Sequence, residues 1–360
     1  MLDAVALVAA ALGLGLMGVA LVIFIGSAGN GYDFVAYDAA ARRILAGEPL
    51  YLADTVARYA SGAYEGLYLY PPPMALALLP LAPLPTSTAT AAWLVLRLGA
   101  LIAGVAILPV SRTTRLLTLA VACVSYPVLF DLNLGNVSVV VFALLAVAWR
   151  SMDGPFGAVA HAALVAIRFP FAVYFVEWLV ERRFQRIAWT LGIGILLIAL
   201  SLLIVGLGTY LDYVTILRGL PDISTGPHNL SLKTTALAVG VPEGIAGAST
   251  IAGYLAGIVA IVAAARRGDR DVAFVVTAVA TLLVSPFIHP HYLVLLLLPA
   301  ALLVERGWVW ALALPLLGWL PDAVLPLTPL VAIGSLFVAP RSSDEPRVET
   351  HGDTVAAAVS

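Results

Sequence analysis

Asp33 is the residue whose type and position most favour a catalytic role. It follows the first apolar run by a few residues and lies within residues 31–73, the longest polar interval of the chain and one rich in tyrosine. A carboxylate held beside apolar helices can keep a pKa suited to proton abstraction, and one base is enough to deprotonate a hydroxyl nucleophile. The structural alternative is a helix cap. It stays open for Asp33, and it is the interpretation we favour for Asp38.

Arg168 is the second candidate. It lies between apolar residues in the run ALVAIRFPF, where Pro170 is expected to end the helix. An ionisable group at membrane depth is by default a functional hypothesis, and a guanidinium suits bidentate binding of phosphate. The alternative is an ion pair with a carboxylate such as Asp131. The two interpretations predict different losses on substitution.

A polar cluster occurs in the segment GPHNLSLK, which holds His228, Asn229, Ser231 and the one lysine of the chain, Lys233. Its hydroxyl, amide and basic groups could bind a sugar or a phosphate. The same segment could equally be a solvated loop. The sequence alone leaves both interpretations open.

A second cluster, SPFIHPHY, contributes His289, His291 and Tyr292 at the start of an apolar run. Two histidines spaced two apart could supply half of a zinc site. A proline separates them, however, and no third ligand is evident. Hydrogen bonding to a substrate or to its phosphate is therefore the interpretation that we favour.

The composition places the chain in a membrane. Of 360 residues, 62% are hydrophobic and 11% charged, whereas soluble domains carry about 25% charged residues. The net charge of −2 argues against a nucleic-acid partner, which would require a basic surface. The single cysteine, Cys123, stands in an apolar run and is expected to be a small buried residue.

Apolar runs predict about twelve transmembrane helices, since about 20 residues suffice to cross the hydrocarbon. The first is expected to be a retained span, because no basic segment precedes it and no A-x-A pattern follows it. Several runs are shorter than a full crossing and are expected to end inside the protein around a water-filled cavity. The runs are 4–25, 88–110, 116–130, 137–149, 156–167, 169–181, 187–207, 245–264, 272–286, 290–304, 308–320 and 323–338.

Arginine placement predicts the orientation. Five turns are basic: SRTTR, WRSMDG, ERRFQR, ARRGDR and ERG. All of them fall on one side if residues 71–84, a short run interrupted by prolines, do not cross. Both termini are then cytoplasmic, and the polar loops lie outside. We expect one membrane domain, 1–340, with an outer loop 26–87.

Two smaller segments complete this organisation. Within the outer loop, residues 34–46 predict an interfacial helix that ends at Gly47. At the other end of the chain, residues 341–360 are polar and predict a disordered cytoplasmic tail.

An ordered set of short motifs runs from about residue 30 to residue 300. Its members are Asp33, Tyr37, Gly47, Leu50 and Tyr51, then Tyr70-Pro71-Pro72, Gly135-Asn136-Val137-Ser138, Arg168-Phe169-Pro170, Asn229-Leu230-Ser231-Leu232, Ser285-Pro286 and His289-Pro290-His291-Tyr292. In this order they resemble glycosyltransferase family 87, which has the GT-C fold and includes polyprenol-phosphate-mannose-dependent mannosyltransferases. The chain departs from the family pattern in four places: Asn136 and Ser138 replace Gln and Asn, Arg168 replaces Lys, and His289 stands where Trp is common.

The resemblance implies an all-α polytopic enzyme of the plasma membrane. It implies inverting transfer of a hexose, mannose in the family's named members, from a polyprenyl-phosphate donor to a hydroxyl of a lipid-linked or cell-envelope glycan. Asp33 is then the base, and Arg168, His291 and Lys233 hold the donor phosphate. Sugar and acceptor contacts are expected from Tyr37, Asn136, His228, Asn229, His289 and Tyr292. No cofactor or metal is implied, because the leaving phosphate has no diphosphate for a cation to bridge.

Two other functional classes compete with this interpretation. A transporter or flippase of lipid-linked sugars would also have many spans and intramembrane charge. Transporters, though, often contain inverted repeats with broken helices in corresponding halves, whereas the polar residues here collect at one face. A non-catalytic membrane scaffold is the third possibility, and it would not need His289, His291 and Arg168 so close to apolar segments.

Overall fold

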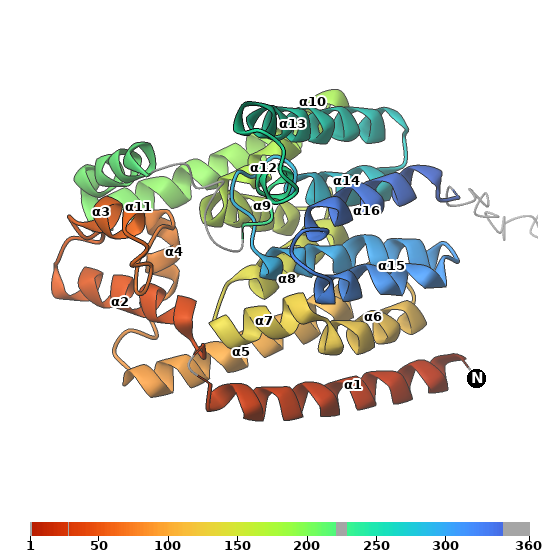
Figure 1. Cartoon of the computed structure of the whole chain (residues 1–360), viewed down its shortest axis with the longest axis horizontal. Helices are drawn as coiled ribbons and strands as arrows, with labels where there is room; N and C mark the ends of the chain where they lie inside the picture. Colours follow the sequence, from red (N-terminus) through yellow and green to blue (C-terminus); the bar gives the residue numbers. More distant parts are fainter. Residues whose placement is uncertain (1, 28, 221–228, 341–360) are drawn as a thin grey trace, which may run out of the picture.

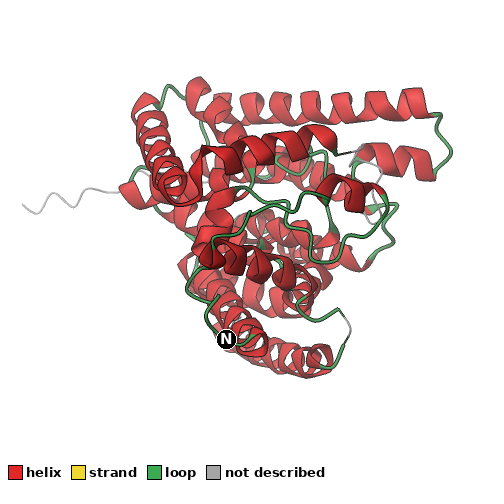
Figure 2. Ribbon diagram, turned by 90° about the vertical axis from the view of Figure 1, so that its left-hand side faces the viewer, coloured by secondary structure: helices red, strands yellow, loops and turns green. Residues whose placement is uncertain are grey.

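The computed structural model describes residues 2–27, 29–220 and 229–340, and within these ranges every regular element is a helix (Figure 2). This confirms the all-α prediction for the described part of the chain. The predictions for His228 and for the tail 341–360 lie outside it. In chain order the helices are α1 (Leu2–Ile25), α2 (Tyr32–Ala46), α3 (Thr55–Ala60), α4 (Pro72–Ala77), α5 (Thr86–Ile107), α6 (Arg112–Val124), α7 (Tyr126–Leu134), α8 (Ser138–Arg150), α9 (Pro155–Ile167), η1 (Phe169–Val173), α10 (Tyr174–Val180), α11 (Phe184–Gly219), α12 (Leu232–Ala238), α13 (Glu243–Arg266), α14 (Arg270–Ala280), η3 (Pro290–Leu296), α15 (Leu297–Glu305), η4 (Val309–Trp319), η5 (Leu325–Leu327) and α16 (Thr328–Val338).

Fewer helices than expected are long enough to cross a membrane. Among the described residues, four helices are long and apolar enough to cross: α1, α5, α11 and α13. Helices α6 and α7, which meet at a 60° bend, would together make a fifth span. The other apolar helices have 10–17 residues. A helix of 13 residues extends about 20 Å, short of the roughly 30 Å hydrocarbon core. The structure thus indicates a multi-pass membrane protein, but it does not show the twelve predicted spans.

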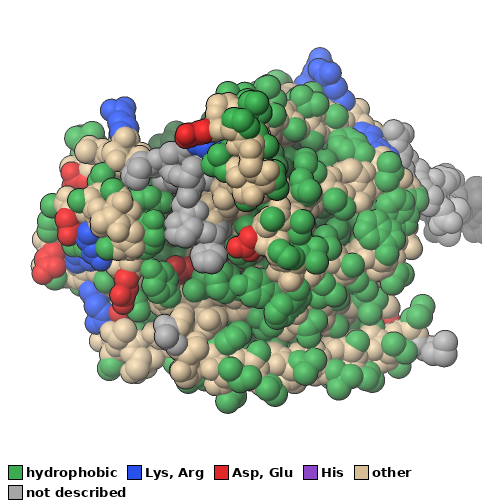
Figure 3. Space-filling view, viewed as in Figure 1, with side chains coloured by type: hydrophobic (Ala, Val, Ile, Leu, Met, Phe, Trp, Pro, Cys, Tyr) green, Lys and Arg blue, Asp and Glu red, His purple; other side chains and the backbone are tan. Residues whose placement is uncertain are grey.

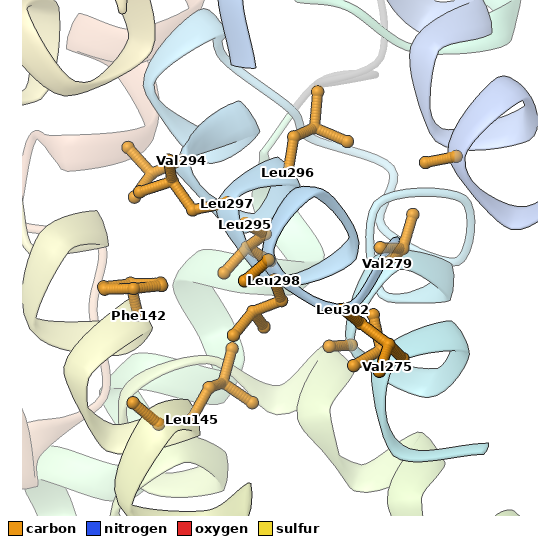
Figure 4. Close-up of a cluster of buried hydrophobic side chains, with 14 of the residues drawn as sticks. Phe142, Leu145, Val275, Val279, Val294, Leu295, Leu296, Leu297, Leu298 and Leu302 are labelled. Atoms are coloured by element: carbon orange, nitrogen blue, oxygen red, sulfur yellow. The ribbon is translucent and has the colours of Figure 1, made fainter. Parts of the chain in front are cut away.

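The core lies between α8, α14 and the run from η3 into α15 (Figure 4). Phe142 and Leu145 of α8 and Val275 of α14 are fully buried, as are Leu296 and Leu298. Between helices in lipid, close packing supplies the stability that removal from water supplies in soluble proteins. This packing fixes the position of η3, whose first turn carries two of the candidate site residues.

The outer surface is largely apolar (Figure 3). Helices α1 and α11 expose leucine, valine and isoleucine along most of their length, and Leu203 is 83% exposed. Soluble monomers rarely expose continuous apolar surface of this extent. The surface is that expected of helices in contact with lipid.

One end of the molecule is built by α2, α3 and α4 (Figure 1). Helix α2 ends at Gly47, which has a left-handed φ of 69° and whose N–H donates to the carbonyl of Ile44. This confirms the helix predicted over residues 34–46. In residues 71–84 the structure has only α4, six residues long, followed by turns, so this segment contains no helix that could cross.

The basic turns meet at the other end, where α1 begins (Figure 1). A series of polar contacts joins them: Thr113 to Asp3, Ser111 to Glu305 at 2.8 Å, Arg306 to Asp269 at 2.8 Å, and Arg270 and Arg183 each to Asp153 at 2.7 Å. The predicted gathering of basic turns on one side is therefore present in the fold.

Candidate active site

A cavity of about 350 Å³ lies at the end built by α2, α3 and α4. Its wall is mostly aromatic, with an acid, an amide and two imidazoles among the polar groups. The described residues that line it are Tyr32, Asp33, Ala36, Tyr37, Tyr59, Tyr64, Leu67, Leu69, Tyr70, Phe130, Leu134, Asn136, Phe287, His289, His291 and Tyr292.

Asp33 faces this cavity from the first turn of α2. Its Oδ2 accepts a 2.7 Å hydrogen bond from Nδ2 of Asn136, which also lies 3.2 Å from the hydroxyl of Tyr37. Burial raises the pKa of Asp33 above its ordinary value, while the Asn136 hydrogen bond and the charge of Arg168 oppose the rise. The residue before α2 is Gly31, and no side chain caps the helix. The capping alternative for Asp33 is therefore not what the structure shows.

Asp38 does not cap a helix either, and the interpretation that we favoured for it is wrong. It lies in the middle of α2, is buried, and pairs with Arg42 one turn later at 2.8 Å. Arg42 also donates to the carbonyl of Leu84 at 2.6 Å. The pair therefore fastens α2 to the turns after α4.

Arg168 lies at the end of α9, directly behind the cavity wall. Its Nη2 donates to Oδ1 of Asn136 and to the hydroxyl of Ser138, both at 3.0 Å, and lies 3.4 Å from the Tyr70 hydroxyl. Its guanidinium carbon stands 3.6 Å from the ring centre of Tyr292. The guanidinium is thus separated from the cavity by Asn136, Tyr70 and Tyr292, a position that the sequence could not predict.

The expected partner of Arg168 in the structural alternative, Asp131, pairs with Arg97 instead. The two are almost fully buried, with Nη1 of Arg97 at 3.7 Å from Oδ2 of Asp131 and donating to the Asp131 carbonyl at 2.7 Å. Oδ1 of Asp131 accepts from the N–H of Ser138 at 2.9 Å. Within the described ranges no carboxylate forms a salt bridge with Arg168.

The Arg97–Asp131 pair holds the turn that carries Asn136, and the sequence analysis missed it. The signal was present, since Arg97 stands inside the apolar run 88–110, where an ionisable side chain needs an explanation.

Gly135 brings this turn against α2. It has a left-handed φ of 78°, and a Cβ added there would lie 2.7 Å from the Cβ of Phe34. The N–H of Gly31 donates to the carbonyl of Asn133 at 2.8 Å, and the indole of Trp93 donates to the Gly135 carbonyl at 2.8 Å. The close approach places Asp33 within hydrogen-bond distance of Asn136.

The histidine cluster lies across the cavity, at the start of η3. The rings of His289 and His291 stack with centroids 5.4 Å apart, and Tyr292 packs edge-on against His291. His291 is 3% exposed, and neither of its ring nitrogens has a hydrogen-bond partner among the described residues. An orphaned imidazole on a cavity wall is suited to a ligand oxygen.

The described residues of the GPHNLSLK segment, 229–233, are not among those that line this cavity. Asn229 donates to the carbonyl of Pro286 at 3.0 Å and accepts from the N–H of Ile288 at 3.0 Å. It therefore orients the segment that leads into His289. Lys233 is buried in the first turn of α12. Neither Asn229 nor Lys233 is among the described residues that line the cavity, and their contacts with a substrate stay a prediction.

Residues 68–286 match the family model of glycosyltransferase family 87. No curated protein and no solved structure matches the chain. The matched range includes Asn136 and Arg168, whereas Asp33 and His291 lie outside it and depend on the geometry above. Because the match covers more than half of the 360 residues, the chain belongs to glycosyltransferase family 87.

Proposed function

We propose that this glycosyltransferase moves a hexose, mannose, from a polyprenyl-phosphate sugar to a hydroxyl of a lipid-linked or cell-envelope glycan. One observation carries the proposal: the amide of Asn136 bonds Asp33 on one side and Arg168 on the other, beside a single cavity. A base and a positive charge are what this transfer requires. The cavity of about 350 Å³ falls in the range usual for small-ligand sites.

Asp33 is the general base of the proposed reaction. It takes the proton of the acceptor hydroxyl, whose oxygen attacks the anomeric carbon as the bond from that carbon to the phosphate oxygen breaks. The electron pair leaves with the polyprenyl phosphate, and the anomeric configuration inverts. Burial favours this role because it raises the pKa of Asp33 and makes the carboxylate a better proton acceptor.

Positive charge and N–H donors stabilise the departing phosphate. Arg168 supplies its charge from behind Asn136 and Tyr292, and a charge so close to a water-poor cavity acts strongly on an anion within it. His291 faces the cavity with free ring nitrogens and donates an N–H to a phosphate oxygen. The leaving phosphate is a monoester without a diphosphate, so the proposed step runs without a metal ion.

The cavity belongs to the extracytoplasmic side in this proposal. The basic turns gather at the end away from the cavity, and short basic loops remain in the cytoplasm. Both termini are then cytoplasmic. A lipid-linked donor enters the cavity from the outer leaflet.

The test is a transfer assay on the purified full chain. Synthetic polyprenyl-phosphate mannose is incubated with a panel of glycolipid acceptors, with and without EDTA. We expect equal amounts of released polyprenyl phosphate and new glycosidic bond in both conditions. Movement of intact donor lipid across liposomes without any new bond would instead assign the protein to the flippases.

A further inference from the structure

A second cavity, of about 660 Å³, lies where α9 and α11 begin. Helix α9 runs from this cavity to Arg168, and its 13 residues span about 20 Å. The cavity is therefore separate from the one that Asp33 lines. The lining residues that matter here are Asp153, Arg182, Arg183, Phe184, Arg186 and Trp189.

Two of its three arginines, Arg182 and Arg186, form no salt bridge among the described residues. Arg183 pairs with Asp153 at 2.7 Å and with Glu181, so its charge is neutralised locally. Arg182 is exposed, and its side chain forms no ion pair or hydrogen bond within the described ranges. Arg186 is 8% exposed, and its Nε is buried without a hydrogen-bond partner.

Neither of the polar side chains near Arg186 accepts a hydrogen bond from it. Glu177 attracts the guanidinium but forms no salt bridge with it among the described residues. Nη2 of Arg186 lies 3.4 Å from Nδ1 of His161, but that nitrogen lies 2.9 Å from the carbonyl of Gly157. A ring nitrogen facing a carbonyl carries the hydrogen, so it cannot also accept one from Arg186. The guanidinium otherwise stacks on Trp178, 4.6 Å from the ring centre. A buried guanidinium whose Nε has no acceptor is suited to an anion that supplies one.

The start of α11 adds further donors. No side chain caps its first turn, and Phe184, Gln185 and Arg186 of that turn line the cavity. The uncapped N–H groups and the positive end of a helix favour a bound phosphate or carboxylate.

The rim of the cavity indicates where the anion comes from. Phe184 and Trp189 are 62% and 55% exposed beside the arginines. Aromatic rings next to arginine are typical of the membrane–water interface. An anion that carries acyl chains would contact both features, while a free ion would use only the arginines.

We propose that this cavity binds the phosphate of an anionic phospholipid headgroup. Arg182, Arg186 and the first turn of α11 hold the phosphate, and Phe184 and Trp189 contact the acyl chains. The proposal does not depend on the function assigned above, because it concerns the other end of α9.

Native mass spectrometry of the full chain in detergent tests the assignment, with phosphatidylglycerol, phosphatidylcholine and inorganic phosphate as separate probes. We expect phosphatidylglycerol to bind more tightly than the other two. Arg182→Gln and Arg186→Gln should each weaken its binding about fivefold or more, since each removes a charge-assisted contact. Arg266→Gln is the matched control, because Arg266 is an exposed arginine of another basic turn that does not line the cavity.

Thermal unfolding of each variant accompanies the binding measurement. Arg186→Gln removes the guanidinium that packs on Trp178. If this variant has a lower melting temperature, the loss of lipid binding is judged from Arg182→Gln instead, because Arg182 is exposed. Equal binding of the two lipids, or equal losses in Arg182→Gln and Arg266→Gln, would overturn the proposal. If inorganic phosphate binds as tightly as phosphatidylglycerol, the cavity is a site for a free anion, and the proposal that it binds a phospholipid is wrong.

Discussion

Asn136 holds Asp33 by a hydrogen bond of 2.7 Å whose direction is fixed. The other atom of the amide, Oδ1, faces three donors: Nη2 of Arg168, the hydroxyl of Ser138 and the N–H of Val137. These donors fix the orientation of the Asn136 amide, so that its Nδ2 is the atom that donates a hydrogen bond to the Asp33 carboxylate. This hydrogen bond stabilises the charged form of Asp33 against the cost of burial.

The pH dependence of transfer should follow the ionisation of Asp33. Because burial raises the pKa of this carboxyl above the ordinary value of 3.8, the base takes up its proton at a higher pH than an exposed aspartate does. Transfer should be full well above the raised pKa and fall as the pH decreases through it. A profile of kcat against pH measures this fall on the acid side. A kcat that stays constant down to the pH at which an ordinary aspartate takes up its proton would contradict the assignment.

Asn136→Ala should move the acid limb to higher pH. The substitution removes a hydrogen bond that favours the charged carboxylate, so the pKa of Asp33 rises further. A substitution that only disturbed packing would lower kcat at every pH and leave the limb where it was. The kcat profile of the variant therefore separates the two effects.

Arg168→Gln should weaken donor binding by about tenfold or more, since a charge beside a low-dielectric cavity acts strongly on a phosphate. Arg168→Lys should retain part of the affinity, because it keeps the charge. Arg218→Gln, an exposed arginine at the end of α11, is the charge-matched control. Titration with a non-transferable donor analogue measures the three affinities, and unchanged binding in Arg168→Gln would remove Arg168 from the phosphate site.

Gly135→Ala should lower both stability and transfer. The left-handed conformation costs a non-glycine residue about 1–2 kcal/mol, and the new Cβ would meet Phe34 at 2.7 Å, which displaces α2 and Asp33. Gly66→Ala is a close control, because Gly66 has a φ of 69° with nothing within 4 Å of its Cβ position. Melting temperature should fall in both variants, but turnover should fall only in Gly135→Ala. Equal turnover in the two would contradict the positioning role.

Arg97→Met should destabilise the protein by about 3–5 kcal/mol, the usual cost of leaving one member of a buried ion pair alone. Arg97 and Asp131 are 2% and 0% exposed, so water cannot replace the missing partner. The double variant Arg97→Met with Asp131→Asn should recover part of the loss. The unfolding free energies of the two single variants and the double variant are measured in detergent. If the losses of the single variants simply add in the double variant, the two side chains do not act as a pair.

The sequence predicted the polar end of the molecule well, because local chemistry determined it. Asp33, Asn136 and His291 are far apart along the chain, yet all three were named from residue type and motif order, and they line one cavity. The helix over residues 34–46 with its terminal Gly47 was also predictable, since a left-handed glycine after a polar helix is a local signal.

Tertiary contacts determined what the sequence could not give. Hydropathy does not reveal where an apolar helix stops, so runs of 10–17 residues were counted as spans. The cap favoured for Asp38 conflicts with the helix predicted over residues 34–46, since Asp38 lies inside that helix and pairs with Arg42 one turn later. Residue type predicts Asn229 and Lys233 as ligands, whereas in the fold Asn229 bonds to the backbone of Pro286 and Ile288.

Transfer by Asp33→Asn is the most direct test of the account. The variant keeps the shape of the side chain and loses the base, so kcat should fall by about 10²–10⁴-fold while donor affinity and melting temperature stay near those of the unmodified protein. Glu48→Gln changes an exposed carboxylate just after the same helix that does not line the cavity, and it should retain transfer. Near-normal turnover in Asp33→Asn would contradict the central claim that this carboxylate accepts the acceptor proton.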